Sequence, residues 1–361
     1  MIDLISFSMV WFVKLRRKYK KVNPPIADKM MHAFALAESL SNSNLEFVLK
    51  GGTGLILLLP NAHRFSIDID IIMSTGRKKI ENILKQICQE QIFIHFTLDK
   101  KRSYQPGIPK AHYKIYYNSE VTNDEEYVLL DILNSKNIYP ACHDKEITSE
   151  WIKTTEPRTF VTIPSIESML GDKLTAFAPH TTGILYGKGK ELEIAKQLFD
   201  IGILFDLVQN ISVVQNSFSN IVQLDIQYRN LTIGMNEVLN DIINTAFLIA
   251  SRGNKLSADG QTKFREIIRG IQSLNEFLIN TRFTLDDAIV ASAKAAYLAA
   301  KILTNDNSVI GHFTDQNSTD LLIDHPEYNH LNKLKKIPGG SLFYWKHTID
   351  LITNTCKLFN I

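Results

Sequence analysis

Asp68 and Asp70, two residues apart, are the side chains of this 361-residue sequence that are best suited to chemistry. They lie in residues 66–73, where polar and apolar residues alternate and isoleucine is frequent, so the pattern predicts a strand with both carboxylates on one face. Neighbouring carboxylates repel each other, and a bridging hard cation such as Mg²⁺ relieves that repulsion. The alternative is an ordinary solvated strand face that binds no metal.

A glycine-rich turn precedes this strand. Lys50-Gly51-Gly52-Thr53-Gly54 leads into apolar residues 55–59, which Pro60 closes, so the glycines are predicted at the start of a short helix. The first N–H groups of a helix have no acceptor within it and favour phosphate. A glycine turn alone is a weak signal. A phosphate turn, a short helix and an Asp-x-Asp strand in this order are the layout that metal-dependent nucleotidyl transfer requires.

A third carboxylate, Asp131, interrupts the apolar run of residues 125–133. A lone carboxylate inside such a strand is costly unless it is paired or bound to metal. If this strand lies beside the strand of Asp68 and Asp70, Asp131 completes a set of three metal ligands. The alternative is a residue at a strand end that reaches solvent.

Two histidines and a basic link lie between these motifs. His95 and His112 fall on predicted strands without metal-ligand partners at close spacing, so we interpret both as structural. The link at 100–109 has loop chemistry and begins with the basic cluster Lys100-Lys101-Arg102. It either borders a groove for nucleic acid or triphosphate, or it is a solvated hairpin loop.

The elements that must position these residues change character along the chain. Periodicity predicts helices at 26–40 and 76–89 and strands at 45–50, 93–98 and 112–117. Beyond residue 164 the pattern is mainly helical, with segments at 165–177, 191–207, 215–224, 232–251, 257–279, 284–303 and 343–359. The alanine-rich part of 284–303 indicates close helix packing in a core.

Composition limits the protein class. The chain is 45% hydrophobic and 22% charged, as in soluble globular proteins, and its length has room for two domains. Its 40 basic and 38 acidic residues leave a net charge of +2, so no overall field indicates nucleic acid or membrane as a partner. Cys88, Cys142 and Cys356 lie far apart and indicate neither a disulfide scaffold nor a zinc site, so we expect a cytoplasmic protein.

The N-terminal segment, residues 1–25, is predicted to form an apolar helix with a basic end. Its apolar part precedes the basic residues 14–21, which is the reverse of a secretory signal, and is too short to cross a bilayer. It is interpreted as a packed amphipathic helix with a solvated basic end. A contact to RNA phosphate and an anchor on a membrane surface are the alternatives.

The ordered motifs resemble those of the AbiEii family, the nucleotidyltransferase-like toxins of bacterial type IV toxin–antitoxin and abortive-infection systems. The resemblance rests on Gly51-Gly52-Thr53, Arg64-x-Ser66-x-Asp68-x-Asp70, Asp131, Asp172-Lys173-Leu174 and Lys196-x-x-Phe199-Asp200. It implies an α+β chain: a DNA polymerase β-like nucleotidyltransferase domain with a mixed sheet at 26–160, then an all-helical domain at 161–361.

The resemblance also implies roles for the site residues. Asp68, Asp70 and Asp131 would hold two Mg²⁺ ions, and Asp131 would help to deprotonate the attacking hydroxyl. The turn of Gly51, Gly52 and Thr53, with Arg64 and Ser66, would bind the NTP. Lys173 of the helical domain would neutralise phosphate charge, and Asp200 would help to organise the site or orient Lys173. Two metals and a cation would stabilise the charge that nucleotidyl transfer builds on phosphate.

The expected function is therefore transfer of a nucleotide from an NTP to a macromolecular acceptor, the 3′ end of tRNA, in toxin–antitoxin or phage-defence systems. A cognate antitoxin is expected, with direct binding left open, and no membrane partner. One alternative is nucleotidylation of a protein or of a small molecule such as an aminoglycoside. Another is a catalytically inactive binding partner, against which the retained Asp68, Asp70 and Asp131 argue.

Overall fold

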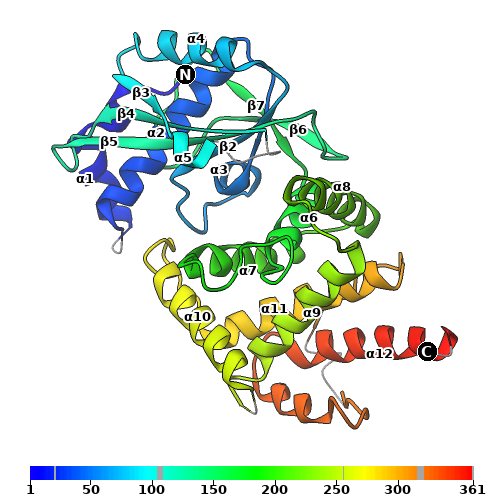
Figure 1. Cartoon of the computed structure of the whole chain (residues 1–361). Coiled ribbons are helices and arrows are strands. Elements are labelled where there is room, and N and C mark those ends of the chain that lie inside the picture. The colour runs from blue at the N-terminus through cyan, green and yellow to red at the C-terminus, as the bar shows by residue number, and fades with distance from the viewer. Residues whose placement is uncertain (20–21, 104–108, 255, 315–320, 360–361) are drawn as a thin grey trace. The chain divides into compact units, whose positions relative to one another are not determined.

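A computed structural model describes residues 1–19, 22–103, 109–254, 256–314 and 321–359, with side chains described as far as residue 354. The chain divides into two compact units. Unit 1 comprises Met1–Ser165 together with Glu276–Thr281, and unit 2 comprises Ile166–Asn275 together with Arg282–Ile361 (Figure 1). Within the described ranges, no helix is long and apolar enough to cross a membrane.

Unit 1 is built on a mixed five-stranded sheet. Its strands, in spatial order, are β1 (Val48–Lys50), β2 (Asp68–Met73), β5 (Glu125–Asn134), β4 (Lys110–Asn118) and β3 (His95–Leu98). The central pair, β2 and β5, is parallel, and every other neighbouring pair is antiparallel. The predicted α+β class with a mixed sheet is thereby confirmed, as is the condition that the Asp131 strand lies beside the Asp68 and Asp70 strand.

Helices cover one face of this sheet, because its inward residues are apolar and strand side chains alternate between faces. Tyr113 of β4 donates a hydrogen bond to Glu81 of α4 (Arg77–Ile87), and Tyr117 donates to Asp28 of α2 (Pro24–Asn42). The helices α2 and α4 therefore lie on the face that carries the buried strand residues. The opposite face carries Asp68, Asp70 and Asp131.

The rest of unit 1 frames the sheet. After η1 (Leu4–Phe7), helix α1 (Met9–Lys18) buries Phe12 and Leu15, and the Trp11 indole donates a 2.8 Å bond to the Trp151 carbonyl. Strands β6 (Cys142–Glu146) and β7 (Phe160–Pro164) pair with each other as a two-stranded antiparallel ribbon. The helical turn α5 (Lys100–Ser103) occupies the start of the predicted loop, whereas residues 104–108 of that loop lie outside the described residues.

A short segment from the middle of unit 2 returns to unit 1. The helix predicted at 257–279 ends at Leu274, as α10 (Ala258–Leu274). Beyond it, the Phe65 amide donates to the Phe277 carbonyl at 2.8 Å, and the Ile279 amide donates to the His63 carbonyl at 3.0 Å. These backbone bonds replace helical ones, which is why the periodicity of the sequence misplaces the helix end.

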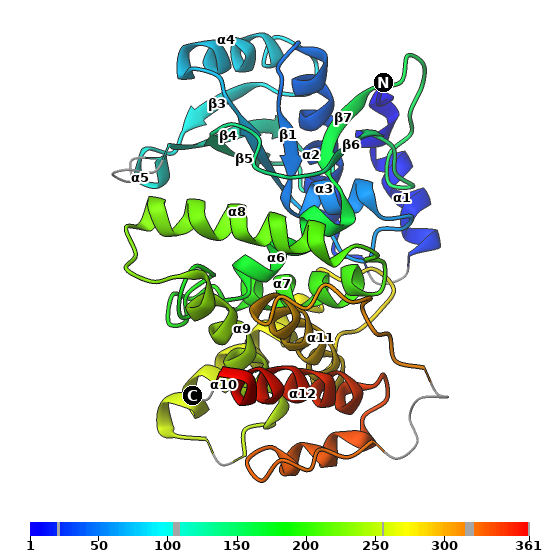
Figure 2. The same cartoon turned by 90° about the vertical axis from the view of Figure 1, so that its right-hand side faces the viewer.

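In the part of unit 2 that the structure describes, the regular elements are helices. Its elements are α6 (Ile166–Ala176), α7 (Glu191–Phe205), α8 (Ile211–Arg229), α9 (Met235–Ala250), α10, α11 (Leu285–Leu303), η3 (Asn329–Lys336) and α12 (Ser341–Phe359) (Figure 2). Helix α11 packs against α7, α9 and α12, and its alanines are almost all buried. The core interpretation of the alanine-rich segment is confirmed, since small side chains let neighbouring helices approach closely.

Candidate active site

The glycine turn lies directly against the second aspartate of the Asp-x-Asp strand. Helix α3 (Gly51–Leu58) begins immediately after β1, as predicted. Gly51 has a φ of +69°, a conformation that glycine adopts without strain. A Cβ atom at Gly51 would overlap the Asp70 carboxylate. Only glycine therefore lets the start of α3 approach Asp70 this closely.

The next two residues of the turn contact the remaining residues of the motif. A Cβ atom at Gly52 would overlap the Ser66 hydroxyl and come within 3.0 Å of Arg64 Nη2, so both side chains lie against Gly52. The hydroxyl of Thr53 is buried and donates a 2.7 Å bond to the Asp68 carbonyl. That hydroxyl fastens α3 to β2, which leaves the backbone N–H as the group of Thr53 suited to phosphate.

Four charged or titratable side chains form a row across the open face of the sheet. The strand register pairs Lys50 of β1 with Asp70, Asp70 with Asp131 of β5, and Asp131 with His112 of β4. Paired residues on adjacent strands project to the same face, and the strands are about 4.8 Å apart. Asp68 lies two residues before Asp70 and shares that face. The structure thus brings the three predicted carboxylates to one region of unit 1.

Asp131 is held by two basic side chains. Its Oδ1 lies 2.6 Å from Nδ1 of His112, and its Oδ2 accepts a 2.9 Å bond from Nη2 of Arg102 on α5. His112, interpreted from the sequence as a structural histidine, thus lies against a predicted metal ligand, a contact that the sequence pattern did not indicate. Arg102, expected in a solvated loop or at the border of a groove, likewise contacts this carboxylate.

The sequence pattern gave no role at the site to Lys50, Arg102 or His112 individually. The basic cluster at 100–102 was a signal for Arg102, since a groove for triphosphate was one interpretation of it. For His112 the only usable signal was its position on the strand that pairs with the Asp131 strand. That register depends on long-range pairing, and neither the composition nor the spacing of residues 112–131 specifies it.

The carboxylates fit a hard divalent cation by their chemistry, since Mg²⁺ prefers oxygen ligands. Among the described residues, no three histidine, cysteine or acidic side chains are already gathered as a metal site. The contacts of Asp131 are one reason, because both of its carboxylate oxygens already contact basic groups. The donor set therefore fits the metal if Asp131 exchanges at least one of those contacts.

The two predicted residues of the helical region are paired with each other within unit 2. Nζ of Lys173, on α6, lies 2.8 Å from Oδ2 of Asp200, on α7. The two side chains are 6% and 1% exposed, respectively. A buried charge needs a partner, and here each residue supplies it to the other. Asp200 therefore fixes the position of the Lys173 ammonium.

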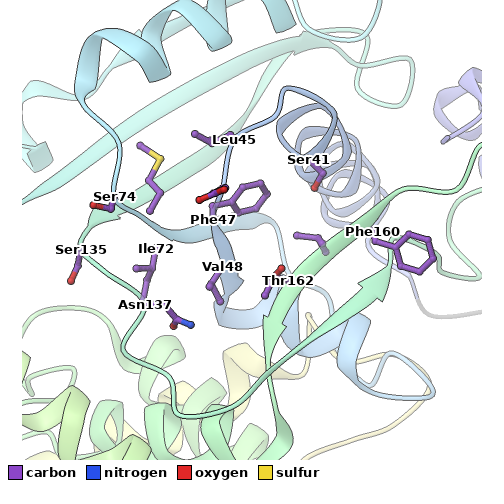
Figure 3. Close-up of a pocket in the computed structure, with 13 residues that line it drawn as sticks. Ser41, Leu45, Phe47, Val48, Ile72, Ser74, Ser135, Asn137, Phe160 and Thr162 are labelled. Carbon is purple, nitrogen blue, oxygen red and sulfur yellow. The ribbon is translucent and has the colours of Figure 1, made fainter.

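A separate cavity of about 430 Å³ opens beside β1 and the β6–β7 ribbon. Figure 3 shows Phe47, Val48 and Ile72 along it, with Ser135 and Asn137 from the segment after β5 and Phe160 on β7. Its lining is a mixture of apolar and small polar side chains and includes none of the predicted site residues. Chemistry and strand register, rather than the depth of this cavity, therefore identify the candidate site.

The chain was compared with curated proteins, solved structures and protein-family models. No curated protein is significantly similar to the sequence. Similar solved structures include a proposed nucleotidyltransferase from H. pylori, with 15% identity, 79% of this chain and 98% of that chain covered, and a TM-score of 0.43. Another is JHP933 from Helicobacter pylori, with 15% identity, 79% and 94% coverage, and a TM-score of 0.42. A nucleotidyltransferase-like antigen from Paracoccidioides brasiliensis has 16% identity, 56% and 92% coverage, and a TM-score of 0.35.

The model of one protein family matches residues 35–276, which is more than half of the chain. It describes the nucleotidyl transferase AbiEii toxin of type IV toxin–antitoxin systems. The matched residues include the glycine turn, all three carboxylates and the pair of Lys173 and Asp200. The chain therefore belongs to the AbiEii family of nucleotidyltransferase toxins, and it is a transferase whose substrate is an NTP.

Proposed function

We propose that this toxin is Mg²⁺-dependent and transfers a nucleotide from an NTP to an RNA acceptor, the 3′ end of tRNA, thereby stopping growth in a toxin–antitoxin or phage-defence system. One observation carries the proposal. Asp70 and Asp131 are register partners on parallel strands, with Asp68 on the same face and the glycine turn directly against Asp70. Nucleotidyl transfer needs ligands for metal and a cradle for phosphate next to each other.

Asp68, Asp70 and Asp131 would hold the metal. When bound, Mg²⁺ would stabilise the charge that develops on the α-phosphate and on the leaving pyrophosphate. Asp131 lies farthest from the glycine turn along the row of strands, so its carboxylate is the one suited to accept the proton of the acceptor hydroxyl. This order follows from the sheet, in which β1 leads into the turn and β5 is separated from β1 by β2.

The first turn of α3 would bind the triphosphate. The N–H groups of Gly52 and Thr53 have no acceptor within their own helix and carry the positive end of its dipole. Arg64 adds a full positive charge against Gly52, and its Nη1 donates a 3.0 Å bond to the Phe65 carbonyl, which orients the guanidinium. Ser66 adds a hydroxyl donor beside the same glycine.

Lys173 would neutralise phosphate charge, and Asp200 would orient it, as the resemblance to the family implies. The 2.8 Å contact between their charged groups supports the second role. An ammonium on a flexible four-carbon chain loses its freedom when a buried carboxylate holds it. Because the ammonium is already in position, less free energy is needed to orient it when the substrate binds.

A polyanionic acceptor suits the surroundings of Asp131. Lys100, Lys101 and Arg102 are exposed on α5, and Arg102 reaches the Asp131 carboxylate. Basic side chains beside a reacting hydroxyl attract a nucleic-acid backbone more strongly than a neutral small molecule. This favours RNA over an aminoglycoside or a protein side chain, and the cytoplasm, which holds both NTPs and tRNA, as the place of action.

The test is to incubate the protein with each α-labelled NTP and with tRNA, total RNA, total protein or an aminoglycoside. Wild type is compared with Asp70→Ala and with the matched control Asp124→Ala, which removes an exposed aspartate from the turn between β4 and β5. We expect Mg²⁺-dependent label on tRNA with wild type and the control. Asp70→Ala should lose at least about 100-fold, as expected when a metal ligand is lost.

Three outcomes would contradict parts of the proposal. If label appears on protein or on the aminoglycoside instead of RNA, the proposed acceptor is wrong but the proposed reaction, nucleotide transfer, is retained. Label that does not need Asp70 would remove the assigned site. Absence of label from every acceptor with every NTP would leave the protein a binding partner rather than an active toxin.

A further inference from the structure

The two groups that hold Asp131 differ in how firmly they are fixed. His112 is set by the sheet, because its strand pairs with the Asp131 strand at this register, and its side chain is only 12% exposed. Its contact with Asp131 Oδ1 is therefore part of the fold. This imidazole orients the carboxylate whether or not a ligand is present.

Arg102 is fixed only through its backbone. The Arg102 amide donates to Asp99 Oδ1 at 3.2 Å, and the next residue, Ser103, fastens α5 to β4 through a 2.9 Å bond from the His112 amide. The side chain is 42% exposed. The guanidinium thus lies at the end of a long, partly exposed side chain on an anchored turn, so it can leave Asp131 while α5 stays in place.

A metal ion and this guanidinium compete for the same carboxylate. A guanidinium that bonds to Oδ2 brings a positive charge next to any cation that Asp131 binds, and two cations on one carboxylate repel each other. The strand register and the low exposure of its ring hold His112 in place, whereas the Arg102 side chain is more exposed. Of the two contacts, the one with Arg102 is therefore the one that a bound divalent cation removes.

We propose that Arg102 is an exchangeable counter-ion of the active site: it neutralises Asp131 in the metal-free protein, yields Asp131 to the metal, and then binds a phosphate of the substrate. This rests on the proposed function, because it requires Asp131 to be a metal ligand. It assigns Arg102 a positioning role before substrate binding and a binding role after it. The guanidinium suits both, since its fork of donors matches carboxylate and phosphate alike.

The exchange has an electrostatic rationale. Without metal, Asp70 and Asp131 on adjacent strands repel each other, and Arg102 reduces that repulsion. With metal bound, the cation takes over that task and the guanidinium becomes available to the triphosphate. Arg102 should therefore weaken metal binding in the absence of phosphate and strengthen phosphate binding in the presence of metal.

Mn²⁺ binding tests the first half without any turnover. Titration with Mn²⁺, followed by the electron paramagnetic resonance of free Mn²⁺, is compared for wild type, Arg102→Ala, Arg102→Gln and Lys85→Ala. Arg102→Gln keeps a hydrogen-bond donor but no charge, and Lys85→Ala removes an exposed charge on α4, which covers the opposite face of the sheet. We expect both Arg102 variants to bind Mn²⁺ about 3- to 10-fold more tightly than wild type, and Lys85→Ala to change binding less than 2-fold.

The second half is tested with inorganic triphosphate as the probe, added to the Mn²⁺-saturated proteins and followed by calorimetry. We expect Arg102→Ala to bind triphosphate about 10-fold more weakly than wild type, with Lys85→Ala close to wild type. Unchanged or weaker Mn²⁺ binding by the Arg102 variants overturns the exchange. Unchanged triphosphate binding overturns the role of Arg102 toward phosphate.

Asp70→Ala separates these results from failure of the proposed function. If wild type binds no Mn²⁺, or Asp70→Ala binds it equally well, the metal site itself is wrong and the exchange falls with it. If Mn²⁺ binding needs Asp70 but ignores Arg102, only the exchange is wrong. Thermal unfolding of each variant confirms that it is folded, and the exposed position of Arg102 makes a folding defect unexpected.

Discussion

Two ion pairs of this chain join a basic residue to an aspartate over almost the same distance, yet they have opposite surroundings. Lys173 and Asp200 of unit 2 are 2.8 Å apart and nearly inaccessible. Arg102 and Asp131 of unit 1 are 2.9 Å apart, with side chains 42% and 22% exposed. The distance alone would make the two pairs equivalent, whereas burial makes the first a permanent contact and the second an exchangeable one.

The difference separates two ways of holding a cation beside an aspartate. A buried pair holds its ammonium in one position, but neither partner can be removed without leaving an uncompensated charge. An exposed pair contributes little to stability, and its partners change readily when a ligand arrives. The buried arrangement lies between two helices, and the exposed one joins the helical turn α5 to the central strand of the sheet.

The largest effect is expected from breaking the buried pair. Lys173→Met should lower the free energy of unfolding by about 3–5 kcal/mol, because the Asp200 carboxylate is left buried without its cation. The double variant Lys173→Met with Asp200→Leu should be more stable than Lys173→Met. Urea unfolding of the three proteins measures this, and a double variant as unstable as the single one would show that the pair is not what fixes these residues.

A smaller loss of stability, with a large loss of function, is expected at the glycine turn. Gly51→Ala forces a side chain into the left-handed region, at a cost of about 1–2 kcal/mol, and displaces the Asp70 carboxylate. Gly187→Ala is the matched control, since Gly187 has a φ of +72° and nothing within 4 Å of an added Cβ. Both variants should lose similar stability in urea, but only Gly51→Ala should lose nucleotide transfer. Equal activity of the two would contradict the close approach of α3 to Asp70.

A third pair, Lys301 with Asp306, lies between the two extremes and predicts a pH dependence. Burial opposes ionisation of Asp306, but hydrogen bonds from Lys301 and Ser308 outweigh it and lower the pKa of the carboxyl to about 2. The Lys301 side chain is fully buried, whereas that of Asp306 is 26% exposed. Because the folded pKa is below the unfolded value of about 4, the pair stabilises the fold above pH 4 and loses this effect as pH falls toward 2.

Asp306→Asn should therefore cost about 1 kcal/mol at pH 6, after allowance for solvent at the carboxylate. The difference from wild type should shrink between pH 4 and pH 2. Urea unfolding of both proteins across this range provides the measurement. A difference that stays constant down to pH 2 would mean that the charge of Asp306 is not the source of the stability.

The smallest effect on stability is expected at the exposed pair. Arg102→Ala should change the free energy of unfolding by less than about 1 kcal/mol, because solvent screens the pair and the backbone of α5 is held independently. Urea unfolding of Arg102→Ala and of Lys173→Met measures both losses in the free energy of unfolding and so compares the two pairs. A loss as large as that of Lys173→Met would show that Arg102 is a fixed structural residue.

The local elements and the order of the motifs could be predicted from the sequence, because alternation and glycine position are local properties. Asp70 and its strand followed from residues 66–73, and the adjacency of Asp131 was stated as a condition that the sheet fulfils. His112 could not be found in this way, because its role depends on the register of β4 against β5. The end of α10 at Leu274 was missed for a similar reason, since the competing partners lie more than 200 residues earlier, at His63 and Phe65.

The return of Glu276–Thr281 to unit 1 has a consequence for how the toxin is made. These residues pair with the backbone on either side of Arg64, so the segment that leads into β2 lacks these backbone partners until they have been synthesised. By then residues 166–275 of the helical unit have been synthesised as well. We expect the segment around Arg64, beside the glycine turn, to be completed late in translation. A truncated chain that ends near Ser165 would then contain all three carboxylates without a finished site.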